Sequence, residues 1–250
     1  MMNFEAIIYQ KDHSILKIVL NRPNRGNAIN RKLLEELEVA IDEATKDNEI
    51  KVIILSGKGR GFCGGADISE IDFHSIEEVE EFLRRFHVLF NKIENIEKPT
   101  IAAINGYALG GGCELVLPCD LRIASETSSI GVPEIKMGFL PGGGGTQRLP
   151  RLIGISRAME MLFTGEPLDA HSAYRIGLFN MVVPNEKLID EAMKLAEILV
   201  NKSPLALKMA KRLVNNGMNM DLRSALELEI QEVSYLSFEA IKRQKGDAGK

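Results

Sequence analysis

Short apolar runs in the first half of the chain predict β-strands. The runs cover residues 4–10, 15–20, 51–56, 100–105 and 121–125. The run at 51–56 is apolar at nearly every position, which is typical of a strand buried in a sheet. Glycine-rich segments at 57–65 and 106–112 each follow a predicted strand. Each of the two segments is followed in turn by a predicted helix.

Apolar residues spaced by three or four predict helices at about 30–45 and 76–96, and in the second of these they fill one face. A short helix carries Glu114, and residues 133–145 are predicted to be loop-rich. The last third of the chain is mostly helical, with predicted helices at about 155–163, 169–175, 187–202, 204–215 and 221–243. Strands alternating with helices, followed by helices alone, predict an α/β core with a helical C-terminal extension.

Composition and charge narrow the class of protein. With 250 residues, 45% hydrophobic and 26% charged, the chain has the composition of an ordinary globular protein. A net charge of −4 gives no general attraction to nucleic acid or to anionic membranes. The N-terminal residues lack the basic stretch and following apolar run of a signal peptide. The least charged stretch, 101–118, holds several glycines and would make a poor membrane span. We therefore expect a cytoplasmic protein with no nucleic-acid or membrane partner.

Three cysteines, Cys63, Cys113 and Cys119, have no paired spacing. An odd count without such spacing argues against a disulfide framework and against a zinc site. The four histidines lie among polar neighbours, which favours surface positions for them. No metal site is predicted.

The first glycine-rich segment formally fits the dinucleotide-binding pattern at Gly59–Gly64. That fold needs a second strand ending in an acidic residue about 20 positions on, and the chain is strongly helical there. The phosphate-binding loop pattern also fails, because no lysine followed by Ser or Thr closes the glycines. Both segments are explained either as tight turns or as places where a ligand approaches main-chain N–H groups. Two convergent N–H donors would form an oxyanion hole for a thioester carbonyl.

Two glutamates stand apart from the others because their neighbours are apolar. Glu114 follows three glycines, and Glu134 follows Pro133. Burial raises the pKa of a carboxylic acid, and two nearby carboxyls push their proton affinities apart, so that one can donate a proton while the other accepts one. The alternative is that each carboxylate only interacts with a helix N-terminus. The residues alone leave both interpretations open.

Six segments carry a resemblance to a known family. They are, in chain order, Leu20–Pro23 with Asn27 and Ala28, Phe62–Ile68, Asn105–Leu115, Cys119–Ala124, Pro133–Ile135 and Leu140–Leu149. In these segments, and in register from about residue 4 to about 240, the chain resembles the enoyl-CoA hydratase/isomerase (crotonase) family. The resemblance implies a ββα spiral catalytic core over residues 1–190. It also implies a C-terminal helical region over 191–250 that builds a homotrimer, or a homohexamer made of two trimers.

The same resemblance implies the site. The N–H groups of Ala66 and Gly111 would form the oxyanion hole, and Glu114 and Glu134 would be the catalytic acid–base pair. The residues implied to lie along the substrate and its CoA moiety are Arg25, Lys58, Ala66, Asp67, Ile68 and Gly111.

Glutamate at both positions favours hydration of a trans-2-enoyl-CoA in fatty acid β-oxidation or a related pathway. Glu114 would deprotonate water and Glu134 would protonate the α-carbon, with no metal or cofactor beyond the CoA of the substrate. The alternatives are a Δ3-Δ2 enoyl-CoA isomerase, a hydratase for cyclic dienoyl thioesters, and a catalytically silent RNA-binding or scaffold protein. Beyond Phe238 the sequence departs from the pattern of typical hydratases, which leaves the acyl-chain preference open.

Overall fold

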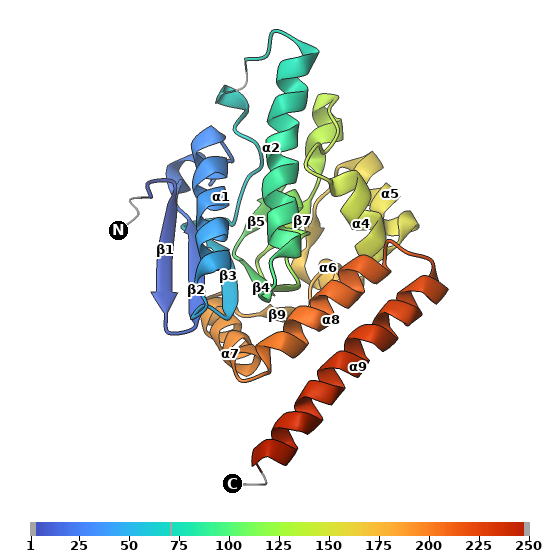
Figure 1. Ribbon diagram of the computed structural model, residues 1–250. Coiled ribbons are helices and arrows are strands. Elements are labelled where there is room, and N and C mark those ends of the chain that lie inside the picture. The colour runs from blue at the N-terminus through green and yellow to red at the C-terminus, as the bar shows by residue number, and fades with distance from the viewer. Residues whose placement is uncertain (1–3, 71, 248–250) are drawn as a thin grey trace.

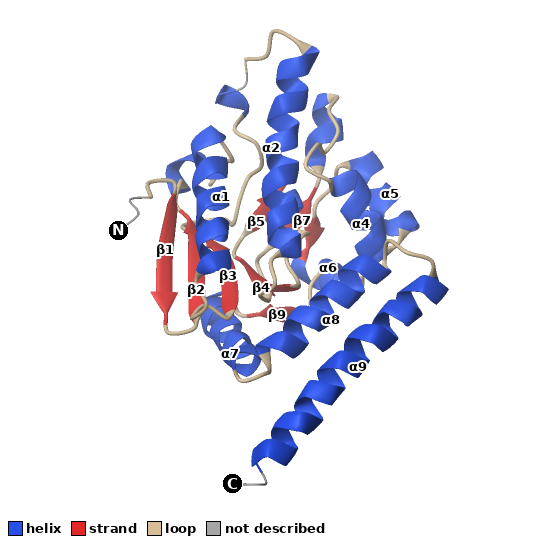
Figure 2. Cartoon of the chain, viewed as in Figure 1, coloured by secondary structure: helices blue, strands red, loops and turns tan. Residues whose placement is uncertain are grey.

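The computed structural model describes residues 4–70 and 72–247, and its strands form two sheets (Figures 1 and 2). The strands are β1 Ile7–Asp12, β2 Ile15–Leu20, β3 Val52–Gly57, β4 Thr100–Ile104, β5 Tyr107–Leu109, β6 Leu121–Ser125, β7 Ser129–Gly131, β8 Leu168–Asp169 and β9 Met181–Val183. The larger sheet has the order β1-β2-β3-β4-β6-β9 and is parallel apart from the β1–β2 pair. The smaller sheet has the order β5-β7-β8.

The α-helices of the described residues surround these sheets. They are α1 Arg31–Lys46, α2 Ile76–Asn95, α3 Gly111–Val116, α4 Gly145–Ile153, α5 Ile155–Thr164, α6 Ala170–Arg175, α7 Leu188–Val200, α8 Pro204–Gly217 and α9 Leu222–Asp247. Short 3-10 helices connect them, namely η1 Pro23–Arg25, η2 Ile68–Glu70, η3 Pro133–Met137 and η4 Asn185–Lys187. Side-chain caps fix the starts of the long helices: Asn30 accepts from the N–H of Leu33, and Ser75 accepts from that of Glu78.

The chain winds in repeated turns, each with a strand in the larger sheet, an extended segment in the smaller sheet and a helix. The second turn runs through β4, β5 and α3, and the third runs through β6, β7 and η3. The first turn leaves β3 and meets the smaller sheet at a single bridge between Cys63 and Ala108. The turns stack on one another. The segments that follow the extended segment of each turn in the smaller sheet therefore lie side by side. This is the predicted ββα spiral.

The larger sheet separates two hydrophobic cores, as strand alternation requires. From β3, Ile53 and Leu55 enter the main core together with α1, α2 and α3. Val52 and Ile54 enter the second core, which α7 covers. The sheet is therefore buried on both faces, in agreement with the apolar run in the sequence.

The last helix leaves the body of the molecule. Helix α9 packs on α8 and then extends away from the sheets (Figure 1). The predicted boundary between residues 190 and 191 falls inside α7, whose Ala192 and Ala196 are buried against the sheet. The division into core and C-terminal region stays a prediction, and the packing of α7 associates that helix with the core.

Most of the predicted elements are confirmed, and the shortest ones were not predicted. The first strand is Ile7–Asp12 instead of 4–10, and α4 occupies a stretch for which no helix was placed. Strands β5, β7, β8 and β9 have only two or three residues each, too few for an alternation to show. Among the described residues, no helix is both long and apolar enough to cross a membrane.

Candidate active site

The turn between β5 and α3 depends on glycines. Gly110 has φ +53° and ψ −126°, a conformation that an L-residue rarely adopts, and its N–H donates to the carbonyl of Gly131 at 2.9 Å. A Cβ on Gly112 would lie 2.3 Å from the carbonyl oxygen of Cys63. The second turn of the spiral thus lies directly on the first, and α3 begins at their contact.

Glu114 projects from α3 and is 3% exposed. Its Oε1 accepts hydrogen bonds from the N–H groups of Gly143 at 2.7 Å and Gly145 at 2.8 Å. Burial raises the pKa of Glu114 to about 7, and the negative charge of Glu134 adds to the increase. The two N–H donors act in the opposite direction, because they stabilise the ionised carboxylate.

Glu134 lies in η3, which begins at Pro133 and ends at Met137, and Gly138 follows in a left-handed conformation. Its Oε2 is buried and has no hydrogen-bond partner among the described residues. A Cβ on Gly110 would lie 2.9 Å from its Oε1, so this carboxyl group contacts the turn before α3. Burial raises the pKa of Glu134, and the backbone N–H of the same residue acts in the opposite direction.

Two main-chain N–H groups have no hydrogen-bond acceptor in the described chain at the place where the first and second turns of the spiral meet. Ile29 pairs with the first glycine-rich segment by donating to Gly65 at 2.7 Å and accepting from Asp67 at 2.9 Å, which leaves the N–H of Ala66 without an acceptor in the described chain. Gly111 is the first residue of α3, where the N–H has no partner inside the helix. A Cβ on Gly111 would lie 3.4 Å from the nitrogen of Ala66, so the two groups are neighbours.

Both carboxyls and both N–H residues line one cavity of about 340 Å³. The rest of its wall is mostly apolar and comes from Ile68, Phe73, helix α2 and residues of the 133–143 segment. Phe73, Phe82 and Phe86 form an aromatic row with ring centroids 5.3 and 5.0 Å apart. The predicted convergence of Ala66, Gly111, Glu114 and Glu134 is therefore present in the structure, whereas their catalytic roles stay predictions.

The residues predicted to lie along the CoA moiety occupy different positions. Ile68 is 57% exposed and lines the mouth of the cavity. Arg25 and Lys58 are exposed, and neither lines the cavity. Their two segments are neighbours, because the side chain of Asn27 donates to the carbonyl of Lys58.

Asp67 is buried and turned away from the cavity. Its Oδ2 forms a 2.9 Å ion pair with Arg22, and its Oδ1 accepts from Ser69 at 2.6 Å. Oδ2 thus has an ionic partner but accepts no hydrogen bond among the described residues, and the N–H of Asp67 donates to the carbonyl of Ile29. The structure gives Asp67 contacts that hold the loop carrying Ala66, while a contact between Asp67 and a ligand stays a prediction.

The donors that hold Glu114 were not predicted as site residues. Gly143 and Gly145 belong to the run of four glycines at 142–145, and this run is the signal in the sequence that marks the loop. Arg148 contacts this loop on the side away from Glu114. It was predicted only to belong to the segment Leu140–Leu149 that resembles the family. Its role depends on contacts with α2 that spacing along the chain does not indicate.

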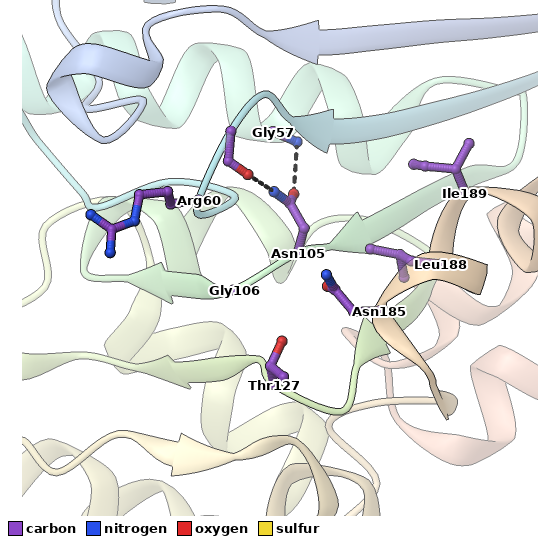
Figure 3. Close-up of a pocket in the computed structure, with 9 residues that line it drawn as sticks. Gly57, Arg60, Asn105, Gly106, Thr127, Asn185, Leu188 and Ile189 are labelled. Atoms are coloured by element: carbon purple, nitrogen blue, oxygen red, sulfur yellow. Dashed lines mark hydrogen bonds between the residues drawn. The ribbon is translucent and has the colours of Figure 1, made fainter.

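A second, more polar cavity of about 280 Å³ contains none of the predicted site residues (Figure 3). It lies beside the carboxyl ends of β3 and β4. The Asn105 side chain accepts from the N–H of Gly57 at 3.2 Å and donates to the carbonyl of Gly59 at 3.1 Å, as the dashed lines in Figure 3 mark. Asn105 therefore ties the start of the first glycine-rich segment to the second.

The remaining titratable groups do not form a second reactive centre in the described part of the chain. Burial raises the pKa of Cys63 and Cys119 to about 12, and that of Cys113 rises well above its usual value, so these thiols are neutral at ordinary pH. The histidines are exposed, as predicted. No group of three or more His, Cys, Asp or Glu side chains is arranged to hold a metal ion within residues 4–70 and 72–247.

The fold and the cavity define a ββα spiral protein with one buried carboxyl, one half-buried carboxyl and two main-chain donors at one site. The model of the enoyl-CoA hydratase/isomerase family matches residues 10–248. The chain belongs to this family.

Relatives agree over nearly the whole chain. The short-chain-enoyl-CoA hydratase of Clostridium acetobutylicum and the crotonyl-CoA hydratase of Syntrophomonas wolfei are each 41% identical over 229 residues, which is 91% of this chain and 88% of either relative. The crystal structure of an enoyl-CoA hydratase subunit from Geobacillus kaustophilus matches with a TM-score of 0.91 at 38% identity, covering 98% of this chain and 94% of that one. These matches confirm the predicted fold and family.

Proposed function

We propose that the protein is an enoyl-CoA hydratase that adds water across the 2,3 double bond of a trans-2-enoyl-CoA to give a 3-hydroxyacyl-CoA. One observation carries the proposal. Glu114 and Glu134, two carboxyls with raised pKa values, line the same cavity as the unpaired N–H groups of Ala66 and Gly111. Addition of water to a conjugated thioester requires a base, an acid and a stabiliser of the enolate oxygen, and these four residues can supply them.

The hydrogen bonds of the two carboxyls support a division of labour. The donors on Glu114 favour its ionised form, although burial still raises its pKa to about 7. Burial also raises the pKa of Glu134, whose Oε2 has no hydrogen-bond partner among the described residues, and this favours the protonated form there. Glu114 takes a proton from water as the oxygen bonds to the β-carbon, and Glu134 gives its proton to the α-carbon. A pKa of about 7 leaves Glu114 about half ionised at pH 7 and largely ionised at slightly alkaline pH, near the optimum for a general base.

The N–H groups of Ala66 and Gly111 would stabilise the reaction electrostatically. Negative charge collects on the thioester oxygen as the β-carbon is attacked, and donors fixed beforehand need no reorganisation. Each such donor typically stabilises a transition state by about 3 kcal/mol. The acid–base steps require no resident metal or redox group, so we propose that CoA enters only as part of the substrate.

The names of the relatives and the exposed residues near the cavity support the finer parts of the proposal. The names short-chain-enoyl-CoA hydratase and crotonyl-CoA hydratase support a short acyl chain and a place in fatty acid β-oxidation or a related pathway. The exposed cations Arg25 and Lys58 suit the phosphates of CoA, with Ile68 beside the pantetheine arm. We further propose a cytoplasmic homotrimer or homohexamer in which α8 and α9 build the subunit contacts.

The proposal is tested by mixing the purified protein with crotonyl-CoA and following the loss of the enoyl absorbance. We expect rapid loss and a 3-hydroxybutyryl-CoA product that is identified by mass. A protein that leaves crotonyl-CoA unchanged but moves the double bond of a 3-enoyl-CoA is an isomerase, and turnover confined to a cyclic dienoyl-CoA indicates the other alternative. Either result contradicts the proposal.

A further inference from the structure

Glu114 is held by a loop from outside its own helix. Gly143 and Gly145 donate to its Oε1, and a Cβ on Gly143 would lie 2.9 Å from Oε2. Gly144, between them, has φ +110° and turns the chain so that the two flanking N–H groups reach the same oxygen. The position of the carboxylate therefore depends on the position of this loop.

Arg148 contacts the loop from the side opposite Glu114. Its Nη1 donates to the carbonyl of Gly143 at 3.2 Å, and a Cβ on Gly144 would lie 2.4 Å from the same nitrogen. The side chain is only 12% exposed and does not line the cavity that holds Glu114. The loop thus lies between the two side chains and has room for no substituent on Gly144.

Helix α2 fixes the arginine in turn. Glu94 accepts from Nη2 at 2.7 Å and from Nε at 3.4 Å, and Asn91 accepts from Nη2 at 2.7 Å. The carbonyl of Glu94 also accepts from Asn215 of α8 at 3.0 Å. A planar guanidinium with this many partners has a fixed orientation. A continuous set of contacts therefore runs from α2 through Arg148 and Gly143 to Glu114.

We propose that Arg148 is a positioning residue for the hydration reaction, which fixes the Gly143–Gly145 loop and with it the carboxylate of Glu114. The inference rests on the proposed function, because it needs Glu114 to act as the base. Arg148 touches no reacting atom and acts only through the loop and through its charge. The structure assigns it both actions.

The charge of Arg148 is one of several around Glu114. Glu134 from η3 raises the pKa of Glu114, whereas Arg148 from α4 lowers it. His87 on α2 lies beside Gly144, and Glu94 neutralises part of the charge of the arginine. Loss of Arg148 removes a cation and raises the pKa of Glu114. Because the base must be ionised, the acid limb of the kcat profile then moves to higher pH.

Three variants separate positioning from charge. Arg148→Gln removes both, and we expect kcat at pH 7 to fall on the order of 10²-fold, with the acid limb shifted upward and KM nearly unchanged. Arg148→Lys keeps the charge but loses the planar fork, so kcat should fall while the acid limb stays in place. Glu94→Gln leaves the charge of Arg148 without its partner. It should lower kcat with an acid limb that stays or moves to lower pH.

The matched control is Arg151→Gln, which changes an exposed arginine on the same helix whose bonds within the described residues are to Gln147. It should keep the wild-type kcat and profile. Each variant is first compared with the wild type by circular dichroism and thermal unfolding. Should Arg148→Gln fail to fold, Arg148→Lys and Glu94→Gln still test the loop.

Several outcomes would overturn the inference. They are wild-type kcat in folded Arg148→Gln, an acid limb that does not move in that variant, and an upward shift in Glu94→Gln. The proposed function fails differently, because then the wild-type protein itself does not hydrate crotonyl-CoA.

Discussion

At the scale of single residues, the two glutamates carry the acid–base chemistry of the account. Glu114→Gln and Glu134→Gln remove a base and an acid while keeping the shape of each side chain. We expect each to lower hydration by about 10²–10⁴-fold with little change in fold. Steady-state kinetics on crotonyl-CoA measure this, with the exposed Glu160→Gln as control. Near-wild-type turnover in either variant removes that residue from the mechanism.

Burial of Glu114 also makes a prediction about stability. Its pKa rises from 4.5 to about 7 on folding. The contribution of the protonated carboxyl to the free energy of unfolding is therefore fully present below pH 4.5 and is lost as pH increases through 7. The free energy of unfolding should therefore decrease between pH 5 and 8, and Glu114→Gln should reduce that decrease by up to about 3 kcal/mol. Urea unfolding at both pH values measures the difference. An identical decrease in the wild type and in Glu114→Gln would show that ionisation of Glu114 does not lower the free energy of unfolding.

Gly110 combines a special backbone conformation with a close contact. Gly110→Ala forces a Cβ to within 2.9 Å of Glu134 and strains a turn that only glycine readily adopts. We expect kcat to fall on the order of 10²-fold, because both Glu134 and the N–H of Gly111 move. Gly177→Ala is the control, since Gly177 also has positive φ but an open Cβ position. It should lower the melting temperature alone, and equal kinetics in the two variants would contradict the account.

How much of the site the sequence could predict depends on where each residue's partners lie. Glu114 and Glu134 stand out because their close neighbours in sequence are apolar or glycine. Arg148 has nothing comparable, because its partner Glu94 lies 54 positions away on another helix. The inward turn of Asp67 likewise follows from Arg22, which a distant loop supplies.

At the scale of elements, length decides what periodicity can predict. The long helices and strands β1 to β4 and β6 of the larger sheet repeat their apolar pattern often enough to be recognised. The strands of the smaller sheet are too short to show an alternation, and they form because the spiral brings them together. The family resemblance supplied that arrangement, which local pattern alone did not.

Helix α2 supplies Val79, Phe82, Leu83 and Phe86 to the apolar wall of the cavity, so we expect it to contribute to the acyl-chain preference. Phe82 lies between Phe73 and Phe86 in the aromatic row. Phe82→Ala opens space there, and we expect kcat/KM for an eight-carbon enoyl-CoA to rise relative to that for crotonyl-CoA. The ratio of the two values measures this, because it cancels general effects on the fold. An unchanged ratio would place the acyl chain elsewhere.

At the scale of the whole molecule, α9 presents an apolar surface that one chain does not cover. Exposed large apolar side chains recur along it, at Leu222, Leu226, Ile230, Val233, Tyr235, Phe238 and Ile241. Burial of such a surface favours association. Sedimentation equilibrium should give three or six times the 27.7 kDa mass of the chain, and Ile230→Asp with Phe238→Asp should reduce that mass. A wild-type monomer would contradict the predicted assembly.

The most direct measurement is a crystal structure with butyryl-CoA, a saturated thioester that can occupy the site but cannot be hydrated. We predict that its carbonyl oxygen lies about 2.7–3.1 Å from the nitrogens of both Ala66 and Gly111. The carboxyls of Glu114 and Glu134 should then flank the α- and β-carbons. A thioester bound with its oxygen away from these nitrogens, or with its carbons out of reach of the carboxyls, would contradict the account.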